Sequence, residues 1–473
     1  MTALLVEREV WLNETLFRAV IHGAFVTQLP ATEAQTRPFL VTNRLVLSIA
    51  VPMTLAYVTT PLLGIVGTVV IGQLGNAALL GGLAAGAIVF DVVFTSFNFL
   101  RSGTTGLTAQ AMGRGDILGE KTAFWHAFVI AVASGVGLAL LGPLIALGGI
   151  AFMGADPGVA EAMSTYIRVR MVGAPLALIN YAVLGYVLGR GEGALGLLLQ
   201  VILNSTNVGL CILFALELHW GVAGVAWASV AGEALAAAVG LSILAIRFAT
   251  SHRLPRSRLL DRAALTRMFS LNRDIMIRSF LLLAAFALFT RQGAQLGTST
   301  LAANAVLMNF FLVAGYFLDG FANAAEQIAG RAIGAHSREA FDRGVSLTTI
   351  WGFALAGLTA TVFLVVGSDL IGLVTTEPVI RQEAREDLVW AALTALSGVL
   401  AFQMDGVFIG ATWSRDMRNM MALSFVIYVG LLFGLGATFG NDGLWAALHL
   451  FLILRGASLL AVLPARRRSA FGA

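Results

Sequence analysis

Apolar segments of about 20 residues or more follow one another along most of the chain, and short clusters of Gly, Pro and charged residues separate them. Segments of this length cross the hydrocarbon core of a bilayer as α-helices. We expect helices at residues 44–70, 78–112, 121–149, 159–189, 194–216, 221–249, 272–297, 300–332, 343–367, 380–412, 418–438 and 443–464. The pattern therefore predicts an all-α membrane protein with about twelve transmembrane helices.

The basic residues predict the orientation of these helices. Every second loop is rich in Arg, as at Arg114 and from Arg253 to Arg273, whereas the loops between them are small or acidic, as at Asp156. Arg381 and Arg385 depart from this pattern, and acidic residues surround both. Because basic loops stay on the cytoplasmic side, we expect both termini in the cytoplasm, which requires an even number of spans.

The two halves of the chain repeat each other in sequence. Matching positions lie 221 or 222 residues apart: Gln73-Leu74-Gly75 with Gln295-Leu296-Gly297, Ala111-Met112-Gly113 with Ala332-Ile333-Gly334, and Gly185 and Gly189 with Gly406 and Gly410. An offset that spans an even number of helices makes the repeat parallel, with its axis along the membrane normal. Two such six-helix lobes suit alternating access, in which the lobes rock about a central cavity.

The repeat also predicts the domain organisation. Residues 39–250 form an N-lobe with helices 1–6, and residues 272–465 form a pseudo-symmetric C-lobe with helices 7–12. A basic cytoplasmic linker at 251–271 joins the lobes. We expect an N-terminal extension at 1–38, either at the membrane surface or disordered, and a basic cytoplasmic tail at 466–473.

Composition agrees with a membrane protein and explains the charge. Of 473 residues, 58% are hydrophobic and only 12% are charged, against about 25% charged in soluble domains. The formal net charge of +4 comes from Arg residues in short loops, which is a topology signal and not a nucleic-acid-binding surface. The single cysteine, Cys211, excludes an internal disulfide. The sequence has no Walker loop, no paired metal ligands and no nucleophile elbow, so we expect no enzyme, no cofactor and no bound metal.

Several longer strings resemble one family. They include Phe99 to Gln110, Leu301 to Phe310, and Asp405 to Ala411 with the following Arg415 to Asn419. Over about residues 38–465 the chain resembles the multidrug and toxic compound extrusion (MATE) family, and within it the branch named for DNA-damage-inducible protein F. The resemblance implies a secondary active antiporter that exports amphipathic, often cationic organic compounds, driven by inward flux of H⁺ or, as second choice, Na⁺. We expect a monomer in the bacterial inner membrane, with small-molecule substrates, the coupling ion and membrane lipids as partners and no nucleic acid.

Two positions depart from the family pattern. Where the family commonly has Val-Asp-Thr on the first helix, this chain has Val66-Gly67-Thr68. Where an Asn-x-x-Leu-Asp string is usual on the fifth helix, it has Asn207-Val208-Gly209-Leu210-Cys211. Both N-lobe acids that the resemblance would supply are therefore missing. Since hard cations need oxygen ligands, we assign no Na⁺ site there.

Polar residues inside the predicted spans are the candidates for proton coupling or substrate binding, because such groups are costly in a membrane and usually functional. Helix 8 places four on one face: Tyr316, Asp319, Asn323 and Glu326. Helix 2 has a matching stripe of Asp91, Thr95, Asn98, Ser102 and Thr105, in which Asn98 is the counterpart of Asp319. The other candidates are Asp405, Asn207, Arg291 and Gln292.

Asp405 and Asp319 suit the coupling role best, since a proton and a cationic substrate would compete for either carboxylate. The alternative for such an acid is a permanent ion pair, for instance with Arg291. We expect Glu233 to be a hydrogen-bond partner between helices. Arg101 is expected to extend towards the cytoplasmic surface.

Two other functions stay open. A flippase for lipid-linked precursors would be favoured by a wide lateral opening and by more Arg along the cavity. A non-transporting membrane scaffold that has lost coupling would be favoured by the missing acids at Gly67 and Cys211. An aqueous cavity that holds Asp319 and Asp405 would oppose the scaffold.

Overall fold

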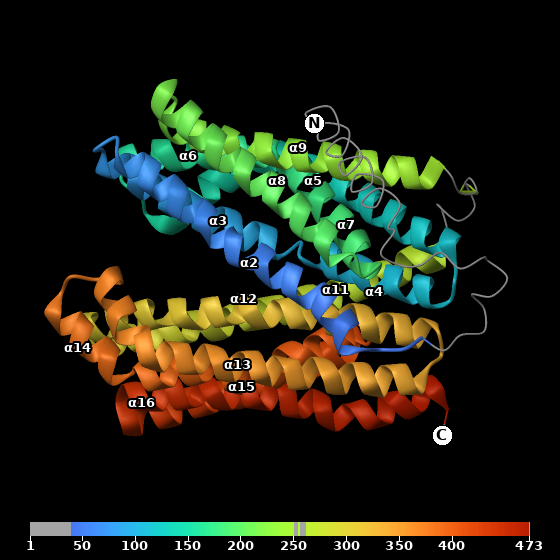
Figure 1. Cartoon of the computed structure of the whole chain (residues 1–473). Helices are drawn as coiled ribbons and strands as arrows, with labels where there is room; N and C mark the ends of the chain where they lie inside the picture. Colours follow the sequence, from blue (N-terminus) through green and yellow to red (C-terminus); the bar gives the residue numbers. More distant parts are fainter. Residues whose placement is uncertain (1–38, 250–253, 256–261, 473) are drawn as a thin grey trace, which may run out of the picture.

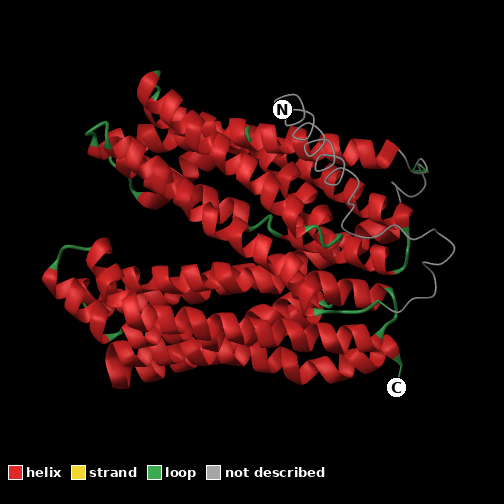
Figure 2. Cartoon of the chain, in the orientation of Figure 1, coloured by secondary structure: helices red, strands yellow, loops and turns green. Residues whose placement is uncertain are grey.

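The computed structural model describes residues 39–249, 254–255 and 262–472, and the regular elements within these ranges are all helical (Figures 1 and 2). The helices are α2 (Asn43–Gly72), α3 (Ala77–Thr95), α4 (Phe99–Gly113), α5 (Ile117–Met153), α6 (Pro157–Val172), α7 (Ala174–Gly189), α8 (Gly193–Cys211), the π-helix η1 (Ile212–Glu217), α9 (Gly221–Ala249), α11 (Arg262–Leu296), α12 (Thr298–Gly334), α13 (Arg338–Val374), α14 (Pro378–Glu386), α15 (Leu388–Gly410) and α16 (Ser414–Phe471). The prediction for residues 1–38 lies outside the described residues.

The helices agree with the prediction of about twelve spans. In the described ranges, nine helical segments are long and apolar enough to cross a membrane, and the bent pair α6 and α7 makes ten. The 58-residue helix α16 breaks at Gly440, where φ is 59° and ψ is −129°, so it supplies two spans in place of one. The 35 residues of α11 are long enough for the twelfth.

Interruptions divide several of the predicted spans. Helices α6 and α7 meet at Gly173 with a bend of 52°, and Pro175 follows within the first turn of α7. Proline has no N–H to donate and crowds the preceding turn, which accounts for a bend at this place. The predicted span at 78–112 is likewise two helices, α3 and α4, separated by residues 96–98.

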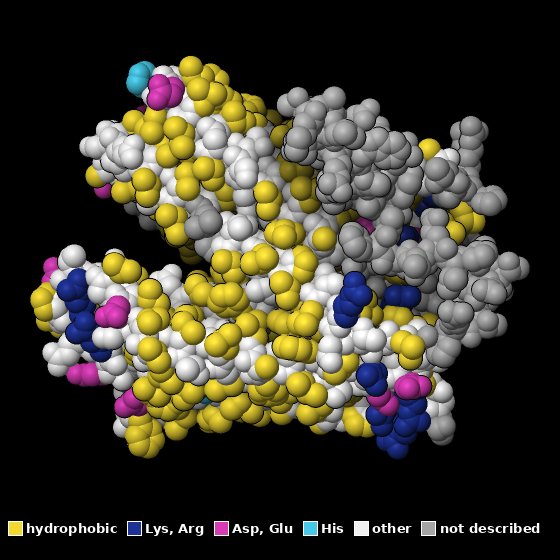
Figure 3. Space-filling model, in the orientation of Figure 1, with side chains coloured by type: hydrophobic (Ala, Val, Ile, Leu, Met, Phe, Trp, Pro, Cys, Tyr) yellow, Lys and Arg dark blue, Asp and Glu magenta, His cyan; other side chains and the backbone are white. Residues whose placement is uncertain are grey.

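The helices form two lobes, α2–α9 and α11–α16 (Figure 1). The lobes lie against each other at the end that carries the C-terminus and diverge towards the end that carries α14. Figure 3 shows this divergence as a wedge-shaped opening in the molecular surface. The contact between the lobes, called the seam here, is formed mainly by α2 and α4 on one side and α12 and α15 on the other.

The sequence repeat is visible in the packing. A Cβ on Gly185 of α7 would overlap the backbone of Arg101 on α4, and a Cβ on Gly406 of α15 would overlap the backbone of Ala322 on α12. Gly189 and Gly410 make the same contacts one turn further along. Both members of each contact differ by 221 residues between the lobes, so the two lobes repeat one helix-packing arrangement.

Glycines also bring the two lobes close together at the seam. A Cβ on Gly106 of α4 would lie 2.6 Å from the carbonyl oxygen of Ile409, and one on Gly334 of α12 would overlap the carbonyl oxygen of Gln110. The side chain of Gln110 crosses the seam as well, because its Nε2 donates to Oγ1 of Thr412 at 3.1 Å. The closed end is therefore packed backbone against backbone.

Two boundaries differ from the prediction. Helix α11 begins at Arg262, inside the expected linker 251–271, and residues 466–471 continue α16 in place of a separate tail. The rings of Phe471 and Phe341 lie 5.4 Å apart between centroids, which holds this end of α16 against α13. Hydropathy missed both extensions because their helical turns contain Arg, which favours helix but not the bilayer core.

Candidate functional site

A polar cluster lies in the seam where α2, α4 and α12 meet. The guanidinium of Arg101 donates from Nη1 to Asn323 Oδ1 at 2.7 Å and from Nε to Asn98 Oδ1 at 3.2 Å. Asn323 in turn donates from Nδ2 to the hydroxyl of Tyr57 at 2.9 Å. These bonds connect the two lobes, and they bring the candidates Asn98 and Asn323 into one cluster.

Sequence reasoning missed two members of this cluster. Arg101 does not extend to the cytoplasmic surface as expected, because α4 continues from Arg101 to Gly113 before it ends. A signal for Arg101 was present, since it lies one helical turn from Asn98 on the polar stripe. Tyr57 had no such signal, because its neighbours along α2 are mostly apolar.

The acids of α12 lie one turn to either side of Asn323. Glu326 is only 3% exposed, and its Oε1 has no hydrogen-bond partner among the described residues. Asp319 is half-buried and interacts electrostatically with Arg101 and Arg278. The polar face of the predicted helix 8 therefore points to the seam, as residues three and four apart on a helix share one face.

Asp405 lies inside the C-lobe, where two arginines hold it. Arg278 Nη1 of α11 and Arg455 Nη2 of α16 each donate to Asp405 Oδ2 at 2.8 Å. The side chain of Arg455 is 4% exposed, and those of Arg278 and Asp405 are 12% exposed. An ion pair, the alternative to proton coupling, is thus present at Asp405. Its partners are Arg278 and Arg455, whereas the side chain of Arg291 is exposed.

The N-lobe holds a buried ion pair of its own. Arg170 Nη2 on α6 donates to Glu233 Oε1 on α9 at 2.9 Å, and the two side chains are 7% and 10% exposed. The guanidinium of Arg170 lies 3.9 Å from the ring centroid of Phe90. Glu233 therefore makes the helix-to-helix contact expected of it.

The remaining candidates are spread over the molecule. Asp91 is exposed on α3, and Tyr316 interacts electrostatically with both Asp91 and Asp319, so Tyr316 lies on the side of α12 that faces the N-lobe. Asn207 donates to Ser229 Oγ at 2.7 Å and joins α8 to α9. Gln292 is half-buried on α11.

Apolar side chains surround the two positions at which the N-lobe acids are missing. Cys211 is 1% exposed in a cluster with Val70 and Val225. A Cβ on Gly67 would lie 3.3 Å from Cγ1 of the same Val225. In this chain both positions therefore serve helix packing. Within the described ranges, no three His, Cys, Asp or Glu side chains form a candidate set of metal ligands.

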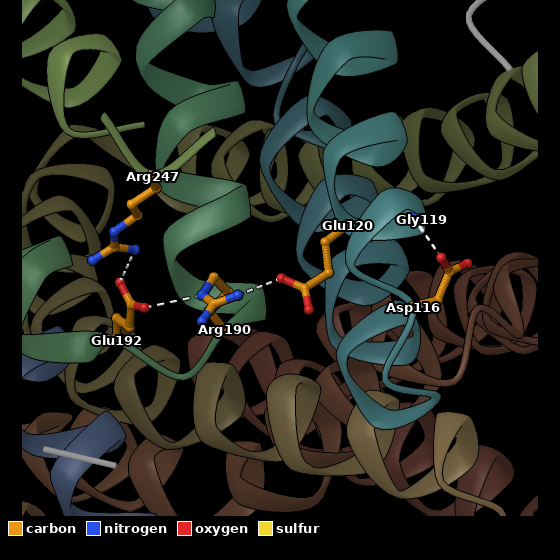
Figure 4. A network of polar contacts seen from close by, with 6 residues as sticks. All are labelled: Asp116, Gly119, Glu120, Arg190, Glu192 and Arg247. Carbon is orange, nitrogen blue, oxygen red and sulfur yellow. Dashed lines mark hydrogen bonds and ion pairs between the residues drawn. The ribbon is translucent and has the colours of Figure 1, made fainter. Parts of the chain in front are cut away.

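A charge network joins N-lobe helices at the closed end (Figure 4). Glu192 accepts from Arg190 Nε at 3.0 Å and from Arg247 Nη1 at 2.6 Å, and Arg190 Nη1 donates to Glu120 Oε2 at 2.5 Å. Burial disfavours the charged form of Arg190, but the carboxylates of Glu120 and Glu192 outweigh it, so the pKa of Arg190 is raised above its ordinary value.

The C-lobe replaces this charge network with aromatic rings. The offset of 221 places Phe341 and Trp413 at the positions of Glu120 and Glu192. Their ring centroids lie 5.9 Å apart. The two positions that carry carboxylates in the N-lobe network therefore carry packed rings in the C-lobe.

The substitution Glu192→Gln is expected to lower the free energy of unfolding by about 1 kcal/mol, because it removes the carboxylate that accepts from both Arg190 and Arg247 in a partly exposed network. Thermal unfolding of the purified protein measures the effect. Glu217→Gln, at an exposed acid of the same lobe, is the matched control. Equal unfolding temperatures for Glu192→Gln and the control would contradict a stabilising role of the network.

Known proteins resemble the chain over most of its length. The MatE family matches residues 52–213 and 275–433. DNA damage-inducible protein F of Escherichia coli K12 is 36% identical over 425 residues, which cover 88% of this chain and 90% of that protein. Protein DETOXIFICATION 44, chloroplastic, of Arabidopsis thaliana is 26% identical over 433 residues, with coverage of 87% and 80%.

Solved structures share the fold. A MATE family multidrug resistance transporter in an outward-facing conformation aligns with a TM-score of 0.82 at 16% identity, over 90% of this chain and 96% of that one. A MATE transporter variant of Vibrio cholerae aligns with a TM-score of 0.83 at 20% identity, over 90% and 97%. A MOP superfamily transporter from Pyrococcus furiosus gives 0.82 at 15% identity, over 91% and 97%. The two-lobed helical architecture predicted from the sequence is confirmed.

Proposed function

The chain belongs to the MATE family of multidrug and toxic compound transporters, and we propose that it is an antiporter that exports amphipathic, often cationic organic compounds in exchange for protons. Residues 52–213 and 275–433, which match the family, fall in the two lobes. We place the protein in the bacterial inner membrane with both termini in the cytoplasm, because the Arg-rich loops gather at one end of the helices.

The observation that carries this proposal is a buried acid in the seam between the lobes. Glu326 is almost fully buried and its Oε1 lacks a hydrogen-bond partner in the described part of the chain, so it can take up a proton without the loss of a bond. Arg101 lies on the facing helix and interacts electrostatically with Glu326. Acids in membrane interiors commonly serve as proton carriers.

The two-lobed arrangement gives this acid access to one side at a time. In the present state, the lobes separate at the end that carries α14 and touch at the other end (Figure 1). When they rock the other way, the same seam would open to the cytoplasm. Proton uptake by Glu326 and Asp319 from outside would release a bound organic cation, and proton loss to the cytoplasm would restore the site for the next one.

We choose H⁺ over Na⁺ as the coupling ion because of the positions at which this chain has acidic residues. The N-lobe positions of the missing acids, Gly67 and Cys211, are packed with Val225 and its neighbours. Asp319 and Glu326 belong to the C-lobe side of the seam. Asp405 stays a candidate for proton coupling, but its two arginine partners would have to separate from it before it could bind a proton.

Efflux of ethidium or norfloxacin from drug-hypersensitive cells is expected to follow an imposed pH gradient, with acid outside, and to be unaffected by a Na⁺ gradient of equal size. A protonophore should abolish efflux, because the proton gradient then no longer drives export. Cells that carry the empty vector are the control. Efflux that follows the Na⁺ gradient would overturn proton coupling, and efflux that ignores both gradients would overturn coupled export altogether.

One observation favours a second function. Among the described residues, the hydrogen bonds of Arg101 go to neutral oxygen atoms, on Asn98, Asn323 and Ser102, so no carboxylate holds its guanidinium by a hydrogen bond and the group could turn to an anionic cargo. A flippase for lipid-linked phosphorylated precursors would use such an arginine. Movement of a fluorescent phospholipid between the leaflets of proteoliposomes, without drug efflux, would support that function instead.

A further inference from the structure

A cavity of about 890 Å³ opens at the closed end of the C-lobe, beside the corner between α15 and α16. Its walls come from the start of α11, from the turn at residues 412–413, and from both ends of α16. Figure 3 shows Lys and Arg side chains gathered near the C-terminus at this end of the lobe. Under the orientation proposed above, the cavity lies at the cytoplasmic surface of the membrane.

The cavity carries an excess of positive charge. Among the described residues, three arginines and one acid line it: Arg273, Arg415, Arg466 and Asp416. Asp416 pairs with Arg466 at 2.6 Å, so the excess comes from the other two arginines. The side chain of Arg273 is 56% exposed, and Arg415 is exposed as well. Both guanidinium groups can therefore turn to a ligand in the cavity.

The nearest buried acid does not cancel this charge. Asp274 is fully buried and accepts hydrogen bonds from Arg418 Nη1 at 2.7 Å and from Ser414 Oγ at 3.1 Å. Arg273 Nη2 also lies 3.2 Å from this carboxylate, but its side chain is the most exposed of the three partners of Asp274. Asp274 therefore holds Ser414 of the cavity wall in place, and the cavity itself stays basic.

The other lining groups suit a phosphate. Thr266 and Ser270 of α11 add hydroxyl donors, and the first turn of α16 follows Trp413, whose side chain provides no cap for the helix. Arginines, hydroxyls and a helix start together are the donor set that proteins use for phosphate groups. Leu271 and Trp413 add apolar surface beside these donors.

The described residues of the equivalent N-lobe corner do not repeat this basic site. The offset of 221 places Glu192, Gly193 and Ala194 at the positions of Trp413, Ser414 and Arg415. Glu192 is occupied there by Arg190 and Arg247 (Figure 4). The two lobes share their helix packing but not the positive charge at this corner. The fold therefore does not require the charge of the cavity, which is specific to the C-lobe.

We infer that this cavity binds a phosphate ester, as presented by the headgroup of an anionic phospholipid at the cytoplasmic leaflet. Basic pockets between membrane helices on this side commonly hold such headgroups. A bound phosphate would connect α11 to both ends of α16. It would do so next to Thr412, which accepts the hydrogen bond from Gln110 across the seam, so the ligand would stabilise the closed end.

Binding of dioleoylphosphatidylglycerol to the purified full-length protein in detergent tests this inference, with dioleoylphosphatidylcholine as the zwitterionic comparison and inorganic phosphate as the soluble one. The wild type should bind phosphatidylglycerol saturably and phosphatidylcholine not. Arg415→Gln should weaken binding about fivefold, and the double variant Arg273→Gln/Arg415→Gln about 25-fold. Arg114→Gln, at an exposed arginine of the N-lobe, is the matched control and should bind as the wild type does.

The two arms distinguish the source of the phosphate. Saturable binding of phosphatidylglycerol that Arg415→Gln weakens supports a lipid headgroup. Saturable binding of inorganic phosphate that the same variant weakens, without binding of the lipid, supports a soluble ester. Equal binding by the wild type and Arg415→Gln would overturn the inference, as would equal affinity for both lipids or no saturable binding at all. Because Arg415 is exposed, its variant reports on binding even if the double variant does not fold.

Discussion

Replacing Asp405 with asparagine is expected to lower the free energy of unfolding by about 3–5 kcal/mol, because the change removes the carboxylate that pairs with two largely buried arginines. Arg278 and Arg455 both donate to one oxygen of this carboxylate, and Arg455 is almost fully buried. Thermal and denaturant unfolding of the purified variant measures the loss. Asp369→Asn, at an exposed acid of the same lobe, should leave stability within experimental error.

A double variant separates this structural role from proton coupling. Asp405→Asn combined with Arg455→Met should lose less stability than Asp405→Asn alone, since the second change removes one of the unpaired charges. If Asp405→Asn keeps the stability of the wild type and loses only pH-driven efflux, the ion triad is not structural. Asp405, one of the two acids that the sequence favoured for this role, would then be the coupling acid.

The number and grouping of helices could be predicted because bilayer thickness fixes the length of an apolar run. The breaks inside those runs could not. Residues 96–98 separate α3 from α4 within one predicted span, and Gly173 separates α6 from α7 within another. The break at Gly440 was predicted, because Asn441 and Asp442 fall between the spans expected at 418–438 and 443–464, and glycine adopts the positive φ of this turn at little cost.

The acidic face of α12 could be predicted from spacing alone, since residues three and four apart lie on one side of a helix. The partners of those residues could not, because they come from distant parts of the chain. Asn323 bonds to Arg101 across 222 residues, and Asp405 bonds to Arg278 across 127. Hydropathy and periodicity report on single helices, whereas the ion triad depends on how three helices pack.

The internal repeat predicted which glycines are equivalent in the two lobes, which the sequence of one lobe could not do. It identified Gly185 and Gly406 as equivalent, and both bring their helices into backbone contact with a neighbour. The chemical type of the side chains does not follow the repeat. Helix packing requires only that side-chain volumes match and that the backbones of neighbouring helices come equally close. Glu192 of the N-lobe charge network therefore corresponds to Trp413 in the C-lobe.

Replacing Glu326 with glutamine is expected to reduce pH-driven efflux at least about tenfold, because the amide keeps the shape of the side chain and cannot carry a proton. Proteoliposomes with an imposed pH gradient measure coupled efflux. Exchange of labelled for unlabelled substrate at equal pH measures binding and movement of the lobes without net proton transfer. The variant should retain exchange within about twofold of the wild type, since the seam packs around the amide as it does around the acid.

Glu339→Gln, at an exposed acid in the first turn of α13, provides the matched control and should leave both activities unchanged. Loss of coupled efflux with intact exchange would identify Glu326 as the proton carrier, because coupled efflux needs a group that binds and releases a proton and exchange at equal pH does not. Loss of both activities would mean that the acid serves substrate binding or seam packing instead. Normal coupled efflux in the variant would exclude Glu326 as the proton carrier, and Asp319 would be the remaining acid of the seam.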